Sequence, residues 1–130
     1  MKLRNRFSKK DSVIDVLVPS GLIASTEKGF YYVKGNKRFK FVSDRARDSW
    51  SLKIVRTTEF AMSSVPVSGL LGFRDGSLLK DVSDGKIYLI SDNKRRHIAS
   101  PDVFLWAGDD IIEVGEKEIS IHQLGDKLHG

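Results

Sequence analysis

Hydrophobic and polar positions recur along this chain at an offset of about 56 residues. Matched positions in the two halves are Gly29, Tyr32, Trp50 and Gly69 against Gly85, Tyr88, Trp106 and Gly125. Self-similarity at a fixed spacing indicates a repeated unit whose neighbours complete its core. The pattern therefore predicts two tandem copies of one small unit, which favours scaffolding or binding over chemistry.

Each copy has the same predicted order of short apolar runs and turns. Opening strands are expected at 22–24 and 78–80, and later strands at 52–55 and 111–114. Between them, hairpins are expected at 30–33 with 38–42 and at 87–90 with 95–99. Asn36 in the first hairpin, and Asp92 with Asn93 in the second, are expected to form the turns. A last helical turn is expected at 58–63 and at 116–123.

A short helix is predicted in the second copy by Ser100 as the N-cap, Pro101 at the first helical position and Gly108 after the end. The first copy has Ser43 and Trp50 at matching places but no proline and no closing glycine, so its helix has weaker signals. Because both tryptophans recur with the repeat, we expect them to be core anchors, with Trp106 buried under its helix.

The predicted fold class is α+β, mainly antiparallel β, built from two tandem copies of a hairpin-plus-short-helix unit. The expected divisions are a basic N-terminal arm and strand at 1–19, copy 1 at 20–70 and copy 2 at 71–130, with a joint at 68–75. A unit of about 50 residues is marginal alone, so we expect the two copies to share one core.

The N-terminal segment has no counterpart in the repeat. Five of the 22 Lys and Arg residues lie in the first ten positions, and the β-branched run 12–19 ends at Pro19, which predicts a strand. One interpretation is an arm that binds an acidic partner and adds a strand to it; the other is a solvated tail followed by a first core strand. The candidate partner-binding residues are Arg4, Arg6, Lys9, Lys10, Val13, Ile14, Val16, Leu17 and Val18.

The segment after the basic residues lacks the apolar run of a secretory signal, because Asp15 interrupts it, and no segment has the length of a membrane span. We therefore expect a soluble protein made without a signal peptide of its own, with no membrane as partner.

Residues typical of catalysis or metal binding do not form a recognisable pattern. Cysteine is absent, and His97, His122 and His129 lack the spacing of a metal site. The turn aspartates do not follow the ligand pattern of a calcium loop, and neither a Gly-x-Ser-x-Gly elbow nor a phosphate-binding loop occurs. The expectation is a protein that is not an enzyme and has no cofactor and no metal.

Two basic runs recur at the same place in both copies, next to aromatic residues. A basic surface of this kind can follow a nucleic-acid backbone, although alternate residues of a strand face opposite ways. With 17 acidic residues against 22 basic ones, nucleic acid is not the expected partner, and a charged strand edge that resists pairing is the alternative. The candidate basic surface comprises Lys37, Arg38, Lys94, Arg95 and Arg96.

The second copy carries a Gly-x-x-Tyr, Lys-Arg, Ser-Pro pattern in 85–88, 94–95 and 100–101, with the closing Gly125. It resembles a repeat module of small tailed-bacteriophage virion proteins and some bacterial surface proteins. The resemblance covers about half of the chain closely and implies a non-catalytic module, with no functional residue to transfer.

The expected function is thus a bacteriophage virion structural or accessory protein, such as a capsid decoration, neck or tail component, made in the host cytoplasm. Its expected partners are other virion proteins, in one or several copies. The alternatives are a carbohydrate or cell-wall binding module and a nucleic-acid-binding protein.

Overall fold

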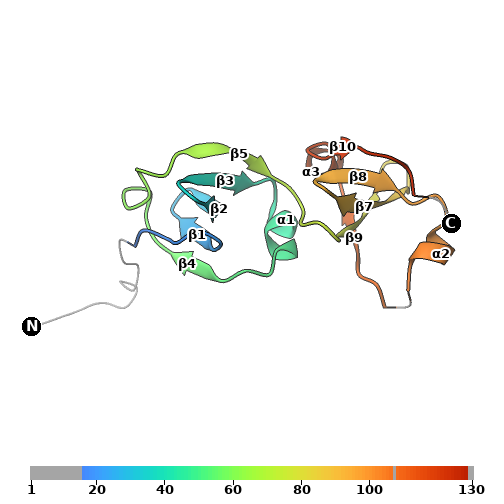
Figure 1. Ribbon diagram of the computed structural model, residues 1–130, viewed down its shortest axis with the longest axis horizontal. Coiled ribbons are helices and arrows are strands. Elements are labelled where there is room, and N and C mark those ends of the chain that lie inside the picture. Colours follow the sequence, from blue (N-terminus) through green and yellow to red (C-terminus); the bar gives the residue numbers. More distant parts are fainter. Residues whose placement is uncertain (1–15, 107, 129–130) are drawn as a thin grey trace, which may run out of the picture. The chain divides into compact units, whose positions relative to one another are not determined.

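The computed structural model describes residues 16–106 and 108–128 (Figure 1). The chain divides into two compact units. The first unit comprises Met1–Phe41 and Leu52–Leu70, and the second comprises Val42–Ser51 and Leu71–Gly130. Val42–Ser51 lies in the first copy of the sequence pattern, yet it packs in the second unit.

The first unit contains one five-stranded sheet with the order β4-β1-β2-β3-β5. Strands β1 to β3 form an antiparallel meander, and β4 returns to pair with β1 in parallel. The strands are β1 (Ile23–Thr26), β2 (Gly29–Lys34), β3 (Lys37–Phe41), β4 (Ile54–Arg56) and β5 (Val67–Leu71).

The sheet of the second unit has the corresponding order β9-β6-β7-β8-β10. Its three central strands are antiparallel, while β9 is parallel to β6 and β10 is parallel to β8. These strands are β6 (Leu78–Asp81), β7 (Ile87–Ser91), β8 (Lys94–His97), β9 (Ile111–Val114) and β10 (Gln123–Leu124).

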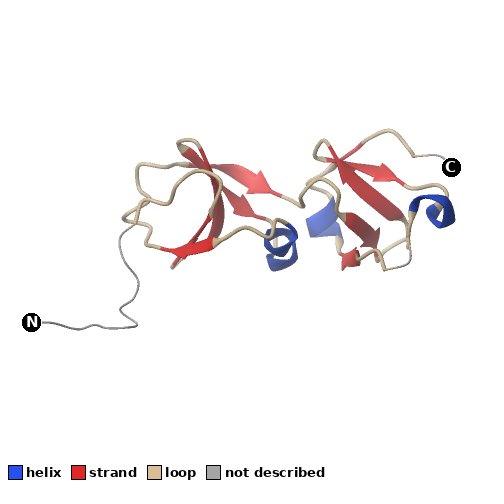
Figure 2. Ribbon diagram, turned by 60° about the horizontal axis from the view of Figure 1, so that its bottom comes forward, coloured by secondary structure: helices blue, strands red, loops and turns tan. Residues whose placement is uncertain are grey.

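Three short helices complete the described chain, as Figure 2 shows in blue. They are α1 (Asp44–Ser49), α2 (Pro101–Phe104) and α3 (Glu116–Ile119). The expectation of a β-rich chain with short helices is confirmed, but the sheets are mixed rather than mainly antiparallel. The reason is that the long connections through α1 and α2 bring the chain back to the sheet in the direction of its first strand.

The strand registers show which tyrosines correspond in the two sheets. Tyr31 pairs with Ala24 and Lys40, and Tyr88 pairs with Leu79 and His97. Both tyrosines are buried. The offset of 56 residues in the sequence pattern matches Tyr88 with Tyr32 instead. A fixed offset does not allow for the different lengths of the turns between the strands.

Each sheet covers a cluster of buried apolar side chains. In the first unit the cluster consists of Val18, Ala24, Val33, Met62 and Val65. In the second unit it consists of Ala46 from α1 together with Phe73, Leu79, Tyr88, Ile90, Val114 and Ile119. The core of the second unit therefore includes one residue from the first copy of the sequence pattern.

The strand predicted over 12–19 is not observed in its described part, because Val16–Pro19 has no regular structure. Strands β5 and β10 were not predicted, and β5 occupies part of the segment expected to be a joint.

A buried histidine fixes the loop that leads into the second sheet. His122 Nε2 accepts a hydrogen bond from the Phe73 backbone N–H at 2.9 Å, so its Nδ1 carries the proton and donates to the Asn93 carbonyl at 2.9 Å. The Asp75 carboxylate accepts from the N–H groups of Asp92 and Asn93, which both have positive φ. His122 and Asp75 together attach this loop to the β7–β8 hairpin turn.

The close approach of backbone to His122 requires glycine at position 72. A Cβ added to Gly72 would lie 2.4 Å from His122 Nε2, well inside contact distance. We expect Gly72→Ala to destabilise the second unit by about 1–3 kcal/mol, the range for overpacking. Gly115→Ala is the control, since a Cβ there meets nothing within 4 Å. Urea unfolding that leaves both variants equally stable would contradict this account.

The stability of the second unit should fall in mildly acidic solution. Burial lowers the pKa of His122, which is 0% exposed, and the nearby Arg95 lowers it further, against the opposing effects of the Asn93 carbonyl and Asp75. A histidine held neutral stabilises the fold above its unfolded pKa of about 6.5, and that stability is lost as the pH falls below this value. Thermal unfolding at pH 8 and pH 5.5 should show the loss, and His122→Gln should abolish it while His97→Gln preserves it.

Candidate functional site

Helix α1 docks on the second sheet through its capping serine and one alanine. Ser43 Oγ accepts from the Ala46 N–H at 3.1 Å and so begins the helix. Ala46 is 0% exposed within the apolar cluster. Trp50 follows the helix and donates from Nε1 to the Gly72 carbonyl at 2.9 Å. The segment is therefore held at its start, its middle and its end.

Glu118 on α3 accepts the hydrogen bonds that hold α1 against the second sheet. Its carboxylate accepts from Ser43 Oγ at 2.7 Å, from Arg45 Nε at 3.0 Å and from the Gly115 N–H at 3.2 Å. A second Arg45 nitrogen bonds to its other oxygen. Burial raises the pKa of Glu118, but the bonds from Arg45 and Ser43 outweigh burial, so the pKa lies below its ordinary value.

A groove of about 650 Å³ lies in the second unit beside α1. The groove is lined by residues from three segments. They are Arg45, Asp48, Ser49 and Ser51 in and after α1, Gly76–Leu78 at the start of β6, and Asp109–Ile112 at the start of β9. Strand β9 is the last strand of its sheet and pairs with β6 alone. The groove therefore lies between the end of α1 and the starts of β6 and β9, and its lining includes three aspartates, Asp48, Asp109 and Asp110.

The structure corrects the expectation for Trp106, which is 81% exposed rather than buried. Helix α2 has only four residues, and Ser100 makes no side-chain cap bond. The Trp106 N–H donates instead to Asp109 Oδ2 at 2.7 Å. Trp106 thus presents a large aromatic side chain at the surface, while its backbone N–H bonds to the Asp109 carboxylate.

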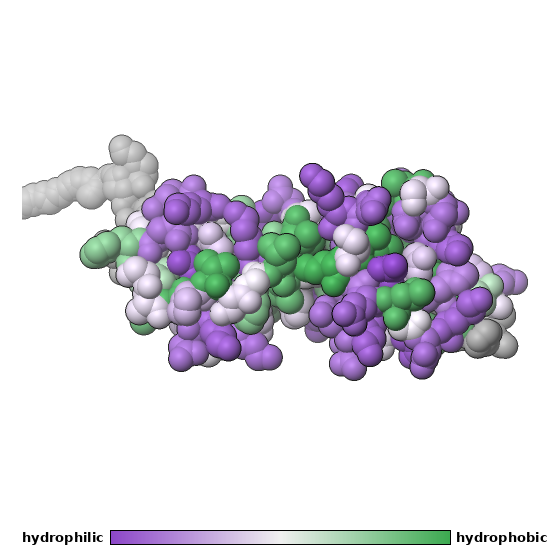
Figure 3. Space-filling model, turned by 90° about the horizontal axis from the view of Figure 1, so that it is seen from above, coloured by the Kyte–Doolittle hydropathy of each residue, from purple (hydrophilic) through white to green (hydrophobic). Residues whose placement is uncertain are grey.

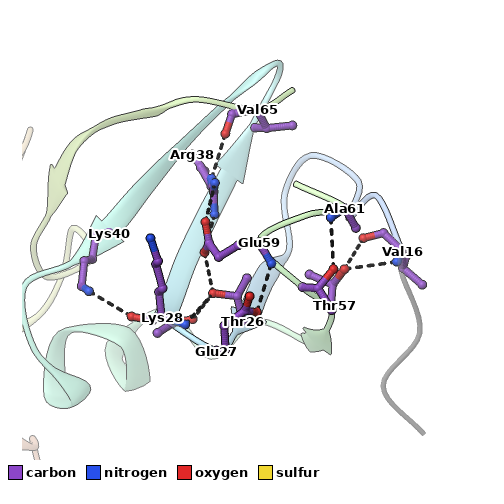
Figure 4. Close-up of polar contacts among 12 residues, drawn as sticks. Val16, Thr26, Glu27, Lys28, Arg38, Lys40, Thr57, Glu59, Ala61 and Val65 are labelled. Carbon is purple, nitrogen blue, oxygen red and sulfur yellow. Dashed lines mark hydrogen bonds and ion pairs between the residues drawn. The ribbon is translucent and has the colours of Figure 1, made fainter. Parts of the chain in front are cut away.

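The first unit contains a buried ion pair rather than an exposed basic surface at Arg38 (Figure 4). Arg38 is 5% exposed, its Nη1 and Nη2 each donate to the Glu59 carboxylate at 2.9 Å, and its Nε donates to the Val65 carbonyl at 2.8 Å. Thr26 Oγ1 donates to the same Glu59 carboxylate at 2.6 Å. The bond from Arg38 is the main reason why the pKa of Glu59 lies below its ordinary value. Arg38 is therefore not part of a candidate basic surface.

The other four residues of the candidate basic surface differ in their contacts and exposure. Arg95 lies over the Tyr88 ring and donates to the His122 carbonyl, and Arg96 Nε donates to the Asp126 carbonyl at 2.8 Å. Lys37 and Lys94 are exposed. Of the five residues, the two lysines present the most accessible charge.

The candidate arm falls into two parts. Arg4, Arg6, Lys9, Lys10, Val13 and Ile14 lie outside the described residues. Val18 is 3% exposed in the core of the first unit, so the expectation that it binds a partner is wrong. Leu17 is 60% exposed, and Val16 bonds to Thr57 Oγ1 through its backbone N–H.

Further apolar side chains lie on the surface of both units, as the green areas of Figure 3 show. Those most exposed besides Trp106 and Leu17 are Phe60, Leu70, Val82 and Leu124. Within 16–106 and 108–128, no three His, Asp or Glu side chains are grouped as metal ligands, and none of the helices there is long and apolar enough to cross a membrane.

Comparisons with family models, with curated proteins and with solved structures give no match for this chain.

The docking of α1 should depend on the Glu118 carboxylate. Glu118→Ala leaves Ser43 and Arg45 without their acceptor, and we expect it to destabilise the second unit by about 1–3 kcal/mol. Glu116→Ala, on the exposed side of the same helix, is the matched control. Chemical unfolding should separate the two variants, and equal midpoints would show that the carboxylate does not hold the helix.

Proposed function

We propose that this chain is a non-catalytic structural or accessory component of a bacteriophage particle, placed in the capsid decoration, neck or tail, and that it acts by protein–protein assembly. The resemblance of its second half to virion repeat modules supports the assignment to a bacteriophage particle. The exposure of Trp106 supports the mode of action and is the observation that carries the proposal.

Trp106 has the properties of an interface anchor. Tryptophan is enriched among the residues that dominate binding energy, because it buries a large rigid surface on contact. The Trp106 N–H also donates to the Asp109 carboxylate. A partner that covers this side chain would gain apolar burial.

The docking of α1 supports an assembling module in a second way. Val42–Ser51 completes a core in the unit that follows its own strands. The core of the second unit therefore needs a segment that precedes its own strands, as is expected of repeated units whose neighbours complete each other's core.

A carbohydrate or cell-wall binding module is the second candidate, since an exposed tryptophan also stacks on sugars. A sugar platform needs several exposed aromatic rings, but Tyr88 is buried and Trp50 is half-buried with its Nε1 bonded to Gly72. Only Trp106 among these three presents its ring at the surface, which favours a single anchor over a sugar platform.

Trp106→Ala should separate folding from assembly. Because the side chain is exposed, we expect a change in unfolding free energy below about 0.5 kcal/mol. Association with particles, measured by mass spectrometry of purified virions from cells that produce the variant, should fall by about tenfold or more. Val82→Ala, which removes another exposed apolar side chain of the second unit, is the control and should associate normally.

Normal incorporation of Trp106→Ala would remove this residue from the partner contact. Absence of the wild-type protein from purified particles would overturn the virion proposal. In that case, loss of binding to cell-wall glycan in Trp106→Ala would support the second candidate.

A further inference from the structure

The groove beside β9 has the features of a site for an added strand. Its lining includes Asp109–Ile112 as well as Gly76–Leu78 at the start of β6, and β9 forms the edge of the sheet. An edge strand presents unpaired backbone N–H and C=O groups to any extended segment that reaches it. Ile111 and Ile112 line the groove and offer apolar contacts to such a segment.

The charge of the groove favours a basic segment. Asp109 and Asp110 lie exposed at its rim, and Asp110 makes no ion pair with any residue in 16–106 or 108–128. Asp48 adds a third carboxylate, although Arg47 pairs with it at 3.0 Å. Arg45 is the cation of the groove, and the Glu118 carboxylate compensates its charge. The rim therefore has an excess of negative charge.

The N-terminal arm matches both properties. Residues 1–15 contain five Lys or Arg and two acidic residues, Asp11 and Asp15, so five minus two leaves a net charge of +3. The β-branched pair Val13 and Ile14 lies between the two aspartates. Such residues favour extended structure and pack well on a pleated surface. The 15 residues before Val16 span up to about 50 Å when extended, longer than the four-residue β9 requires.

We propose that the groove beside β9 binds the N-terminal arm, residues 1–15, of a second molecule of this chain. Val13 and Ile14 add beside β9, and the basic residues before them lie against Asp109 and Asp110. The contact joins different surfaces of two molecules, so it links copies head to tail. This inference rests on the proposed function, because an assembling component needs a contact between molecules.

Cross-linking of the full chain tests which segment occupies the groove. Because the chain has no native cysteine, only the introduced cysteines react. Two single variants, Ile14→Cys and Ile111→Cys, are mixed and treated with a short bismaleimide. We expect a cross-linked heterodimer, and at least about tenfold less of it in 0.5 M salt, where exposed charges are screened. Val82→Cys in place of Ile111→Cys is the control for random collision.

The double variant Ile14→Cys/Ile111→Cys tests whether the arm binds its own molecule. An internal cross-link whose yield does not change with protein concentration, together with no heterodimer in the mixture, would overturn the proposal. A heterodimer yield equal to that of the Val82→Cys control would overturn it as well.

Charge reversal tests the rim without cysteine. Asp110→Lys should weaken self-association, measured by analytical ultracentrifugation, by about tenfold, and Lys9→Glu/Lys10→Glu should restore it in the combined variant. Glu116→Lys is the matched control. Unchanged association in Asp110→Lys would contradict the assigned site. The wild-type protein present in purified particles would then still support the proposed function, so the two failures are distinguishable.

Discussion

The second unit depends on one polar contact between segments that are 75 residues apart in the chain. Ser43 Oγ donates to Glu118 Oε2 and also accepts from the Ala46 N–H, so a single hydroxyl begins α1 and attaches it to α3. The Glu118 side chain is only 10% exposed, and its charge is acceptable there because Arg45 and Gly115 supply further donors. With α1 in place, Ala46 closes the apolar cluster that the second sheet would otherwise present to water.

The two sheets share a strand order but close their cores with different chemistry. Arg38 and Arg95 occupy corresponding positions, each opposite a core residue of the neighbouring strand, and each lies over a buried tyrosine at 4.6 Å and 5.6 Å. Both guanidinium groups donate to a backbone carbonyl. Arg38 has Glu59 as its additional partner, whereas the second unit places His122 in that region. The backbone arrangement therefore tolerates different side chains provided that the buried donors find acceptors.

Local signals in the sequence predicted the places of most strands, turns and short helices, but not the relative lengths of the helices or the parallel pairs. The strand expected at 111–114 is observed as β9, and Asp92 and Asn93 form the predicted reversal. The helix with the stronger local signals, after Ser100 and Pro101, is the shorter one, and α1 is longer because Glu118 supports it from a distant segment. No local pattern encodes such a contact.

The error at Trp106 has the same origin, because a shared position in the pattern does not give a shared environment. Trp50 donates to the Gly72 carbonyl in the second unit, while Trp106 is 81% exposed and its backbone N–H bonds to the nearby Asp109. Strands β5 and β10 escaped prediction since one contains glycine and the other has two residues. The candidate groove combines α1 and β9, which are joined only by tertiary packing.

Two interpretations of the N-terminal segment, a partner-binding arm and a segment of the core, apply to different residues of it. Val18 belongs to the core of the first unit, and the Val16 backbone is tied to Thr57 Oγ1 as both donor and acceptor. These contacts fix the chain from Val16 onward, although the Leu17 side chain is 60% exposed. Residues 1–15 contain five Lys or Arg together with Asp11 and Asp15, and charge complementarity raises the association rate and selectivity more than the affinity. An arm of this kind needs a partner surface with apolar contacts and opposite charge, and Asp109–Ile112 places both on four consecutive residues.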